Sequence, residues 1–266
     1  MLQLLKIEWL KIKGYRTFWV LTTLFVISIF GINYSAYYVK QVAVQSNKQV
    51  NFILGAPFSF PNVWHTVSYF SSFLLFIPGL MIITSITNEF NYKTTRQNII
   101  DGWSRQQFIW VKIALVVSLS LIAAFFVFLT AIIFGTISGD AFSFLKIEFI
   151  GYYFIQALSY SMVALLFGLI IKRPGLAIGV FFLYSFIIEN MAGAFLTWYS
   201  RNNQTMKGFG DYLPLNTTDS LIPFPFLRNV IRFGTQPSIY VLLGLSAAYL
   251  VLYYFIATKK FQRDDL

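Results

Sequence analysis

Residues 88–112 read NEFNYKTTRQNIIDGWSRQQFIWVK and form a polar segment between two long apolar runs. The segment contains six charged side chains, namely Glu89, Lys93, Arg96, Asp101, Arg105 and Lys112. Placing even four of them at the centre of a bilayer would cost roughly 10 kcal/mol or more, because each costs about 2.5–3.5 kcal/mol on an insertion scale. We therefore expect the segment to lie in water, with Lys112 snorkelling to the interface from the start of the next apolar run.

The composition indicates a membrane-embedded chain. Of its 266 residues, 57% are hydrophobic, 20% aromatic and 11% charged, whereas soluble domains carry about a quarter charged residues. Apolar runs of about 20 residues, long enough to cross a bilayer, recur throughout, and no stretch between them is large enough for a separate soluble domain. Cysteine is absent, which excludes disulfides, thiolate metal sites and thiol catalysis.

Six apolar runs are predicted to be transmembrane helices, over residues 18–38, 66–87, 113–136, 149–171, 175–199 and 237–258. Both termini and the connections after the second and fourth spans then lie on one side of the membrane. That side has 13 of the 20 basic residues, and the other side has seven, spread over longer loops. Under the positive-inside rule both termini are expected in the cytoplasm. The net charge of +10 then mostly reflects topology, and attraction to anionic lipid headgroups is a secondary use.

Residues 1–16 are predicted to form an amphipathic helix in the cytoplasmic interface. Leu2, Leu5, Trp9 and Ile12 share one helical face, and Gly14 separates the segment from the first span. The alternative is a frayed polar tail. A cleavable signal peptide is disfavoured because its hydrophobic core would be too long and no small-residue cleavage site stands out.

The polar segment has the local features of a helix, a stop and a second helix start. No Gly or Pro occurs in residues 88–100, and Gly102 is typical of the position just past a helix end. Ser104 and Gln107 have the S-x-x-Q spacing of a capping box.

Two interpretations of this segment stay open. It is either a solvated turn, or a short helix held at the membrane surface to receive a cytoplasmic partner. Ile99, Ile100 and Trp103 favour the second interpretation, because a purely solvating loop has little use for apolar side chains.

A longer pattern runs from Glu89 to Arg105, E-F-x-x-x-T-x-R-x-x-I-x-x-G-x-S-R, and Lys112 follows where the next span opens. It resembles the region between the second and third spans of the type-2 permeases of ATP-binding-cassette (ABC) exporters. That family pairs a six-span permease with a separate ATPase, and this region is the coupling helix that docks in a groove of the ATPase. The amphipathic N-terminal helix, the six spans and the C-terminal sequence KKFQRDDL are also similar to the family.

The resemblance implies an all-α polytopic permease of one transmembrane domain, residues 1–266, with an elbow helix at 1–16, a coupling segment at 88–106 and an outer loop with re-entrant helices at 200–235. It implies two permease copies, or one copy with a paralogue, bound to two ATPase subunits that carry ATP and Mg. The expected location is the inner (plasma) membrane of a bacterium. The residues expected to couple to the ATPase are Glu89, Lys93, Thr94, Arg96, Ile99, Ile100, Gly102, Trp103, Ser104 and Arg105.

Motifs of several enzyme classes do not occur in the sequence. It has no G-x-x-x-x-G-K-[ST] loop, so ATP-driven transport would need hydrolysis on another polypeptide. His65 is the only histidine and is expected to be structural or interfacial, so no metal site is predicted. There is also no G-x-S-x-G nucleophile elbow. We expect no enzymatic activity or cofactor in this chain itself, and no nucleic-acid partner.

The fifth span contains IIENMAG, in which Glu189 and Asn190 are candidates for a transport pathway. At 1.5 Å per residue from Gly175, Glu189 would lie roughly 20 Å across a core of about 30 Å. Ionisable residues at such depth often mark a pathway. The alternative is that Glu189 reaches the outer interface, or pairs with a neighbouring span simply to hold it.

The connection before the sixth span contains DSLIPFPFLRNVIRF, residues 219–233, which is too apolar for a water-washed loop. Leu227, Val230 and Ile231 suggest a short helix against the membrane, and the resemblance suggests re-entrant helices here. The alternative is an interfacial loop with aromatic anchors.

Small residues four positions apart indicate close helix packing, and they more often serve packing within one subunit than between subunits. These pairs are Gly175 with Gly179, Ala164 with Gly168, and Gly244 with Ala248.

Three functions are compared. The favoured one is the permease subunit of an ABC exporter, which moves substrate across the membrane. The second is a non-transporting scaffold that anchors a cytoplasmic signalling or assembly complex. An intramembrane enzyme is disfavoured, because the spans offer few converging polar groups.

Overall fold

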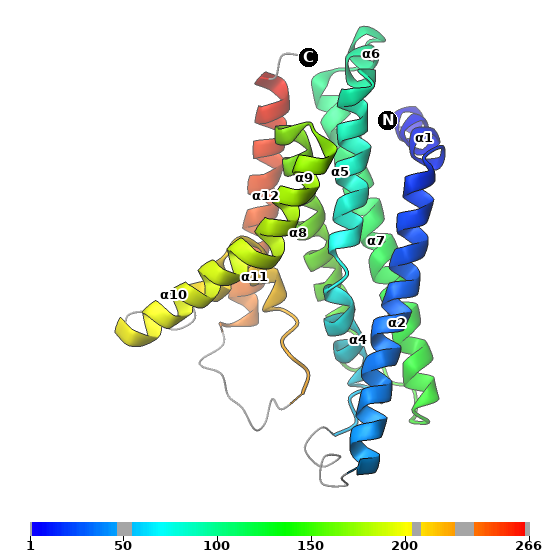
Figure 1. The fold of residues 1–266 in the computed structure, drawn as a ribbon, viewed down its shortest axis with the longest axis vertical. Helices are drawn as coiled ribbons and strands as arrows, with labels where there is room; N and C mark the ends of the chain where they lie inside the picture. The colour runs from blue at the N-terminus through cyan, green and yellow to red at the C-terminus, as the bar shows by residue number, and fades with distance from the viewer. Residues whose placement is uncertain (1, 47–54, 204–208, 227–236, 264–266) are drawn as a thin grey trace.

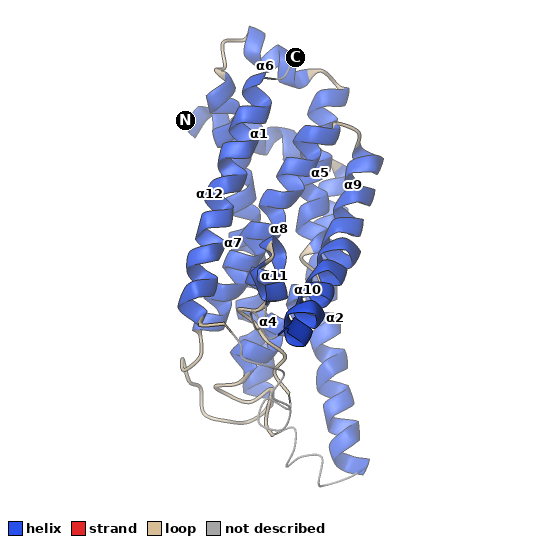
Figure 2. Cartoon of the chain, turned by 90° about the vertical axis from the view of Figure 1, so that its left-hand side faces the viewer, coloured by secondary structure: helices blue, strands red, loops and turns tan. Residues whose placement is uncertain are grey.

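The computed structural model describes residues 2–46, 55–203, 209–226 and 237–263. Regular structure in these ranges is helical, and none of the described residues forms a strand. The helices pack side by side in one elongated bundle (Figure 1, Figure 2). The predicted all-α architecture is therefore confirmed.

Five helical runs in the described chain are long and apolar enough to cross a membrane. They are α2 (Arg16–Ser46), α7 (Arg105–Ile137), α8 (Glu148–Ile171), the run Pro174–Tyr199 and α12 (Ile239–Arg263). The pair α4 (Val63–Ser72) and α5 (Phe76–Asn91), bent by 46°, makes a sixth if it is counted as one span. These elements correspond in order to the six predicted spans and make the chain an integral membrane protein.

Both termini lie at one end of the bundle, which we call the α6 end (Figure 1). It holds α1 (Leu2–Lys13), α6 (Thr94–Ile100), the α8–α9 connection and the last turn of α12. The opposite end, called the α4 end, holds the end of α2 and the connection between α7 and α8. The helices thus alternate in direction as the predicted order of spans requires.

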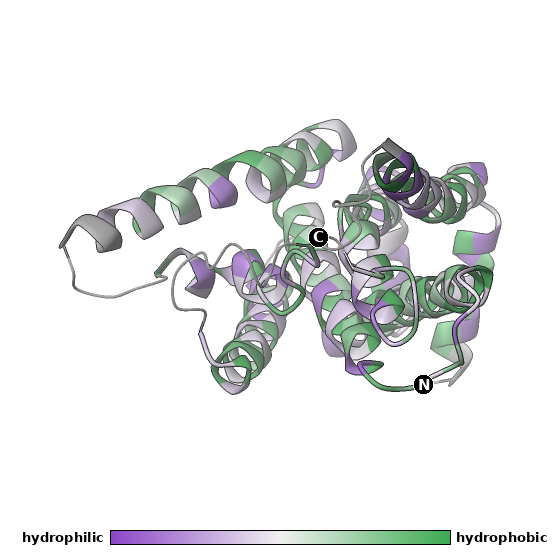
Figure 3. Cartoon of the chain, turned by 90° about the horizontal axis from the view of Figure 1, so that it is seen from below, coloured by the Kyte–Doolittle hydropathy of each residue, from purple (hydrophilic) through white to green (hydrophobic). Residues whose placement is uncertain are grey.

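Helix α8 lies at the centre of the bundle and packs against α4, α5, α7 and α12. In its most apolar 18-residue window 67% of the residues are buried, against 17% for α2 and for α12. Figure 3 shows hydrophobic residues along the helices of the bundle, and many large apolar side chains on α2, α7, α10 and α12 are exposed. Apolar faces turned outwards in this way are suited to lipid rather than to water.

The close approach of α5, α8 and α9 depends on small residues. A Cβ on Gly79 would lie 2.4 Å from the ring of Phe181 and 3.3 Å from Cβ of Ala164. Gly168, one turn further along α8, faces Ile86 on α5, and a Cβ there would lie 3.5 Å from it. The predicted pair of Ala164 and Gly168 therefore packs within the bundle.

The other two predicted pairs lie on outward faces. Gly175, Gly179, Gly244 and Ala248 are all exposed, and a Cβ added to any of the three glycines would meet nothing within 4 Å. These small residues do not mediate packing within the described part of the chain.

The predicted fifth span is helical but not straight. It consists of α9 (Pro174–Phe182), a π-helix η1 (Leu183–Ile188) and α10 (Glu189–Asn203). Figure 1 shows α10 turning sideways, away from the bundle axis, after η1. Insertion of a π-helical turn is one of the recognised causes of a helix kink.

Two short helices precede α12 within the predicted outer loop, namely η2 (Phe209–Tyr212) and α11 (Pro214–Asp219). Helix α11 packs against α8 and α12. The helix predicted at Leu227, Val230 and Ile231 lies outside the described residues.

We expect Gly79→Ala to destabilise the bundle. The new Cβ would meet the ring of Phe181, which is fully buried and stacks on Phe76 with centroids 5.4 Å apart. Overpacking of this kind costs about 1–3 kcal/mol, so the midpoint of thermal unfolding in detergent should fall. Gly179→Ala, on the outward face of α9, is the matched control. Its midpoint should stay or rise, because alanine favours a helix over glycine by up to about 1 kcal/mol. Equal midpoints for the two variants would contradict this packing.

Candidate functional site

The predicted polar segment folds into a short helix between two sharp turns. Helix α5 ends at Asn91, and Lys93 adopts a left-handed conformation with φ of 56° before α6 begins. After α6, Gly102 has φ of 97°, which is the conformation that glycine adopts most readily. Helix α7 then starts with the predicted capping box, in which Ser104 and Gln107 exchange side-chain and backbone hydrogen bonds. The predicted helix stop and helix start are thus both present.

Four charged side chains beneath α6 form what we call the ion cluster: Glu8, Lys11, Glu89 and Lys112. The amine of Lys112 pairs with Glu8 Oε1 and lies 2.9 Å from Glu89 Oε2. The amine of Lys11 lies 3.0 Å from Glu89 Oε1 and 3.4 Å from Asn98 Oδ1. The cluster has no net charge, and it joins α1, α5, α6 and α7.

The ion cluster is largely shielded from solvent. The side chains of Lys112, Glu89 and Glu8 are 1%, 4% and 5% exposed, whereas Lys11 is 23% exposed. The prediction that Lys112 snorkels to the interface is therefore wrong. A buried ammonium is stable only when it is paired, and the two carboxylates supply those partners inside the protein.

The N-terminal segment is a helix, as predicted, and the residues of its predicted apolar face differ in how far they are buried in the bundle. Ile12 is 3% exposed and Glu8 is 4% exposed, whereas Trp9 is 48% exposed. The charge pairing of Glu8 turns α1 so that Trp9 faces outwards. Leu5 is half-buried, and the side chain of Leu2 lies outside the described residues.

The outer surface of α6 is partly apolar and partly basic. Ile100 is 71% exposed and Tyr92, at the end of α5, is 70% exposed. Arg96 and Lys93 are also exposed. These four residues form what we call the α6 surface. A few exposed apolar anchors beside basic groups are typical of a protein-docking surface.

The other predicted coupling residues support α6 from beneath. Ile99 packs against the core, and Trp103 is half-buried with the amine of Lys11 5.5 Å from its ring centroid. The hydroxyl of Thr94 donates to the carbonyl of Glu89 at 3.3 Å. These contacts fix the position of α6 and leave its outer face to the α6 surface.

Arg105 ties α7 to the end of α12. Its guanidinium donates to the carbonyls of Phe261 at 3.3 Å and Gln262 at 2.6 Å. Such carbonyls at a helix C-terminus have no partner within the helix. Phe261 also stacks on Phe108 with centroids 4.4 Å apart.

The ten predicted coupling residues come from one segment of the sequence. In the structure, some of them are exposed on the α6 surface and the others contact neighbouring elements. The structure also adds Glu8, Lys11 and Tyr92, which the motif did not include. Lys11 and Glu8 lie more than 75 positions before their partners in the sequence. A local pattern carries no signal for such pairs.

The predicted pathway residue Glu189 lies at the start of α10 and is 3% exposed. Its carboxylate accepts the backbone N–H groups of Leu215 and, at 2.9 Å, Asn216. These groups belong to the first turn of α11, where backbone donors lack partners within the helix. Glu189 therefore holds α11 in place. The side chain of Asn190 donates within η1, to the carbonyls of Ser185 at 3.0 Å and Phe186 at 3.3 Å.

The second contact between α10 and the short helices is a close approach of two glycines, Gly193 and Gly210. A Cβ on Gly210 would lie 2.2 Å from the carbonyl oxygen of Gly193, and a Cβ on Gly193 would lie 2.3 Å from the amide nitrogen of Asn216. The two glycines let α10 lie directly on η2.

A cleft opens where α4, α8, α10 and α11 meet. It has an outer chamber of about 530 Å³ and an inner chamber of about 180 Å³, and both are lined by Tyr69, Asn190, Asp219 and Ile222. The carboxylate of Asp219 accepts from Gln156 Nε2 at 2.8 Å and from the Tyr160 hydroxyl at 3.1 and 3.2 Å. We call this feature the Asp219 cleft.

His65 has a structural environment. Its Nε2 lies 2.7 Å from the carbonyl oxygen of Pro223, and its ring stacks on Phe149 with centroids 4.1 Å apart. Within the described ranges, no three His, Cys, Asp or Glu side chains are grouped in a way that could hold a metal ion.

Removal of one member should reveal how strongly the ion cluster stabilises the fold. We expect Lys112→Met to lower the free energy of unfolding in detergent by roughly 3–5 kcal/mol, because it leaves two buried carboxylates facing each other. Adding Glu8→Gln restores charge balance and should recover part of that loss. Lys6→Met, at an exposed lysine of α1, is the control and should have little effect. If the single and double variants were equally unstable, charge balance in the cluster would not be the cause.

Of two comparisons with known proteins, one gives a match. A search of curated proteins gave no match. A family model described as "Protein of unknown function (DUF2705)" matches residues 35–266, a range that begins within α2 and includes α6, the Asp219 cleft and α12. The chain therefore belongs to this family.

Proposed function

We propose that the chain is the permease subunit of an ABC exporter, in which ATP and Mg are bound by a separate ATPase. Two permease copies, or one copy with a paralogue, would bind two ATPase subunits. The observation that carries this proposal is the α6 surface, an apolar and basic patch on a short helix at the end of the bundle where both termini lie. It lies on the segment whose sequence resembles a coupling helix, and that resemblance supports the proposal.

The contacts that hold α6 in place support a role in transmitting force from a partner to the bundle. Two sharp turns hold the helix between α5 and α7, and Asn98 on α6 contacts Lys11 of the ion cluster. The same cluster holds α1, α5 and α7 together. A force on α6 would therefore move α1, α5 and α7 as a unit, instead of being absorbed by a flexible loop.

The balance of apolar and charged residues suggests where docking energy comes from. Exposed ion pairs typically contribute about 1 kcal/mol or less, whereas a buried apolar or aromatic anchor can contribute about 2 kcal/mol or more. Ile100 and Tyr92 would then supply most of the affinity, and Arg96 would add orientation and electrostatic attraction.

The distribution of basic residues supports a cytoplasmic α6 end. Lys13 and Arg16 flank the start of α2, and Lys172 and Arg173 connect α8 to α9 at the same end. Lysine and arginine near span ends are enriched on the cytoplasmic side. A cytoplasmic α6 end would place the α6 surface in the compartment that contains ATP.

Copurification tests the proposal. We expect the wild-type chain, solubilised in mild detergent from its native host, to retain a protein that carries a G-x-x-x-x-G-K-[ST] loop and hydrolyses ATP. Arg96→Glu combined with Ile100→Ala should weaken this association by about thirtyfold or more, the equivalent of losing one anchor of about 2 kcal/mol. Mass spectrometry identifies the partner and ATP hydrolysis quantifies it.

The matched control combines Arg173→Glu with Leu176→Ala, which makes the same kinds of change at an exposed residue just before α9 and an exposed residue within α9. This variant should retain the ATPase. A wild-type chain that captures no ATPase, even after crosslinking in membranes, would contradict the proposal. A wild-type complex with a partner that lacks an ATPase would favour the scaffold function instead.

A further inference from the structure

The inner chamber of the Asp219 cleft contains buried polar atoms that the protein leaves without partners. Gln156 and Ser185 are 2% and 4% exposed, and both line this chamber. Among the described residues, neither Gln156 Oε1 nor Ser185 Oγ has a hydrogen-bond partner. Buried polar atoms in native proteins nearly always have one, so these two atoms are open to a partner that the described residues do not supply.

The charged side chains that line the cleft, among the described residues, are acidic. Asp219 lies at the junction of the two chambers, and Asp211 lines the outer one. None of the described residues that line either chamber is basic. Among the described residues, Asp219 accepts hydrogen bonds from the neutral groups of Gln156 and Tyr160 and from no cation. When ionised, its carboxylate is a buried anion without a described cationic partner, and it attracts a cation.

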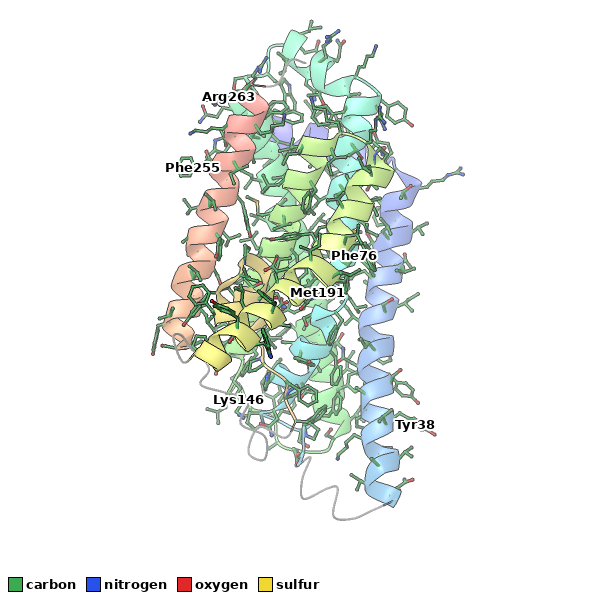
Figure 4. All side chains as sticks on the ribbon, turned by 60° about the vertical axis from the view of Figure 1, so that its left-hand side comes forward. Tyr38, Phe76, Lys146, Met191, Phe255 and Arg263 are labelled. Carbon is green, nitrogen blue, oxygen red and sulfur yellow. The ribbon has the colours of Figure 1, made fainter. Side chains whose placement is uncertain are left out.

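Aromatic side chains line the inner chamber, and some of them are also exposed on the outside of the bundle. Phe73, Phe76 and Phe186 line it, and Phe73 and Phe186 are 51% and 40% exposed on the outside of the bundle. Figure 4 shows Phe76 at the height where α10 leaves the bundle. An apolar group could therefore extend from the chamber along these rings towards the surrounding lipid.

We propose that the Asp219 cleft binds a primary ammonium group whose apolar portion lies along Phe73 and Phe186. An ammonium carries three donors and no acceptor. The Asp219 carboxylate, Gln156 Oε1 and Ser185 Oγ can each accept one of these three hydrogen bonds. The faces of the aromatic rings add cation–π attraction. A phosphate group beside the amine would be repelled by Asp219 and Asp211. An amine without a neighbouring anion therefore fits better than an aminophospholipid headgroup.

The size of the inner chamber is compatible with this ligand. About 180 Å³ corresponds to roughly six water molecules at about 30 Å³ each. A small arylalkyl amine occupies a similar space. The proposal concerns binding alone and does not rest on the proposed transport function, because it can be measured on this chain without an ATPase.

Equilibrium dialysis with radiolabelled 2-phenylethylammonium tests the proposal, using the full chain in nanodiscs of phosphatidylcholine. We expect saturable binding at one site per chain. The neutral isostere 2-phenylethanol should not compete. The trimethylammonium analogue should compete about tenfold less well, because it keeps the charge but has no N–H to donate.

Three substitutions locate the site. Asp219→Asn keeps the shape and removes the charge, and should weaken binding by about tenfold or more. Ser185→Ala removes a hydroxyl that holds no structural hydrogen bond, so it should weaken binding while the chain stays folded. Asp140→Asn, at an exposed residue of the α7–α8 connection, is the matched control and should bind like the wild type.

The pH dependence gives a further test. Burial raises the pKa of Asp219 to about 7, and hydrogen bonds from Gln156 and Tyr160 act in the opposite direction. Among the described residues, the other titratable groups that face Asp219 are Glu189 and Tyr69, and Asp211 lines the outer chamber. Because only the ionised carboxylate attracts the cation, binding should be about tenfold weaker at pH 6 than at pH 8.

Adding phosphatidylethanolamine to the nanodiscs distinguishes the two sources of an amine. We expect no competition, which would support a free amine as the occupant, whereas competition with the probe would show that a lipid headgroup binds and would contradict the preference for an amine without a neighbouring anion. The proposal is overturned if the wild type binds no amine saturably, as a cleft filled only with water would behave. It is equally overturned if 2-phenylethanol competes, or if Asp219→Asn and Ser185→Ala, shown to be folded by size-exclusion chromatography, bind like the wild type.

Discussion

The pairing of Lys112 with two carboxylates is the interaction on which the α6 end depends. Its amine is almost completely removed from solvent, and an unpaired buried charge would be unstable. Glu8 must therefore approach from α1 and Glu89 from α5. Once these helices converge on α7, Lys11 reaches both Glu89 and Asn98. The position of α6, and with it the α6 surface, follows from this network of charges.

A second carboxylate organises the region before α12 in a different way. Glu189 accepts two backbone N–H groups from the first turn of α11, and the glycine contact between Gly193 and Gly210 holds α10 on η2. With α11 fixed, Asp219 at its last position comes to face Gln156 and the inner chamber. One buried acid thus has a structural role, and it positions a second acid that borders a cavity.

Local features of the sequence were the predictable ones. The order of long apolar helices, the Gly102 stop and the Ser104 capping box could be predicted, because apolar length and capping depend on neighbouring residues. The burial of Lys112 and of Glu8 could not, because both depend on which helices meet. The π-helix and the sideways turn of α10 also escaped prediction, since Leu183–Ile188 contains no Gly or Pro that would signal a break. The contacts of Glu189 with the backbone of α11 agree with the alternative interpretation, in which Glu189 holds a neighbouring element in place.

The compartment in which α6 lies can be measured directly, because the chain has no cysteine and a single one can serve as a reporter. Ile100→Cys would place the reporter on the α6 surface, and Asp140→Cys would place it in the α7–α8 connection at the α4 end. A membrane-impermeant maleimide should label Asp140→Cys on intact cells and should label Ile100→Cys only in inverted vesicles. Labelling of Ile100→Cys on intact cells would place α6 outside the cytoplasm and contradict its role as a docking site for an ATPase.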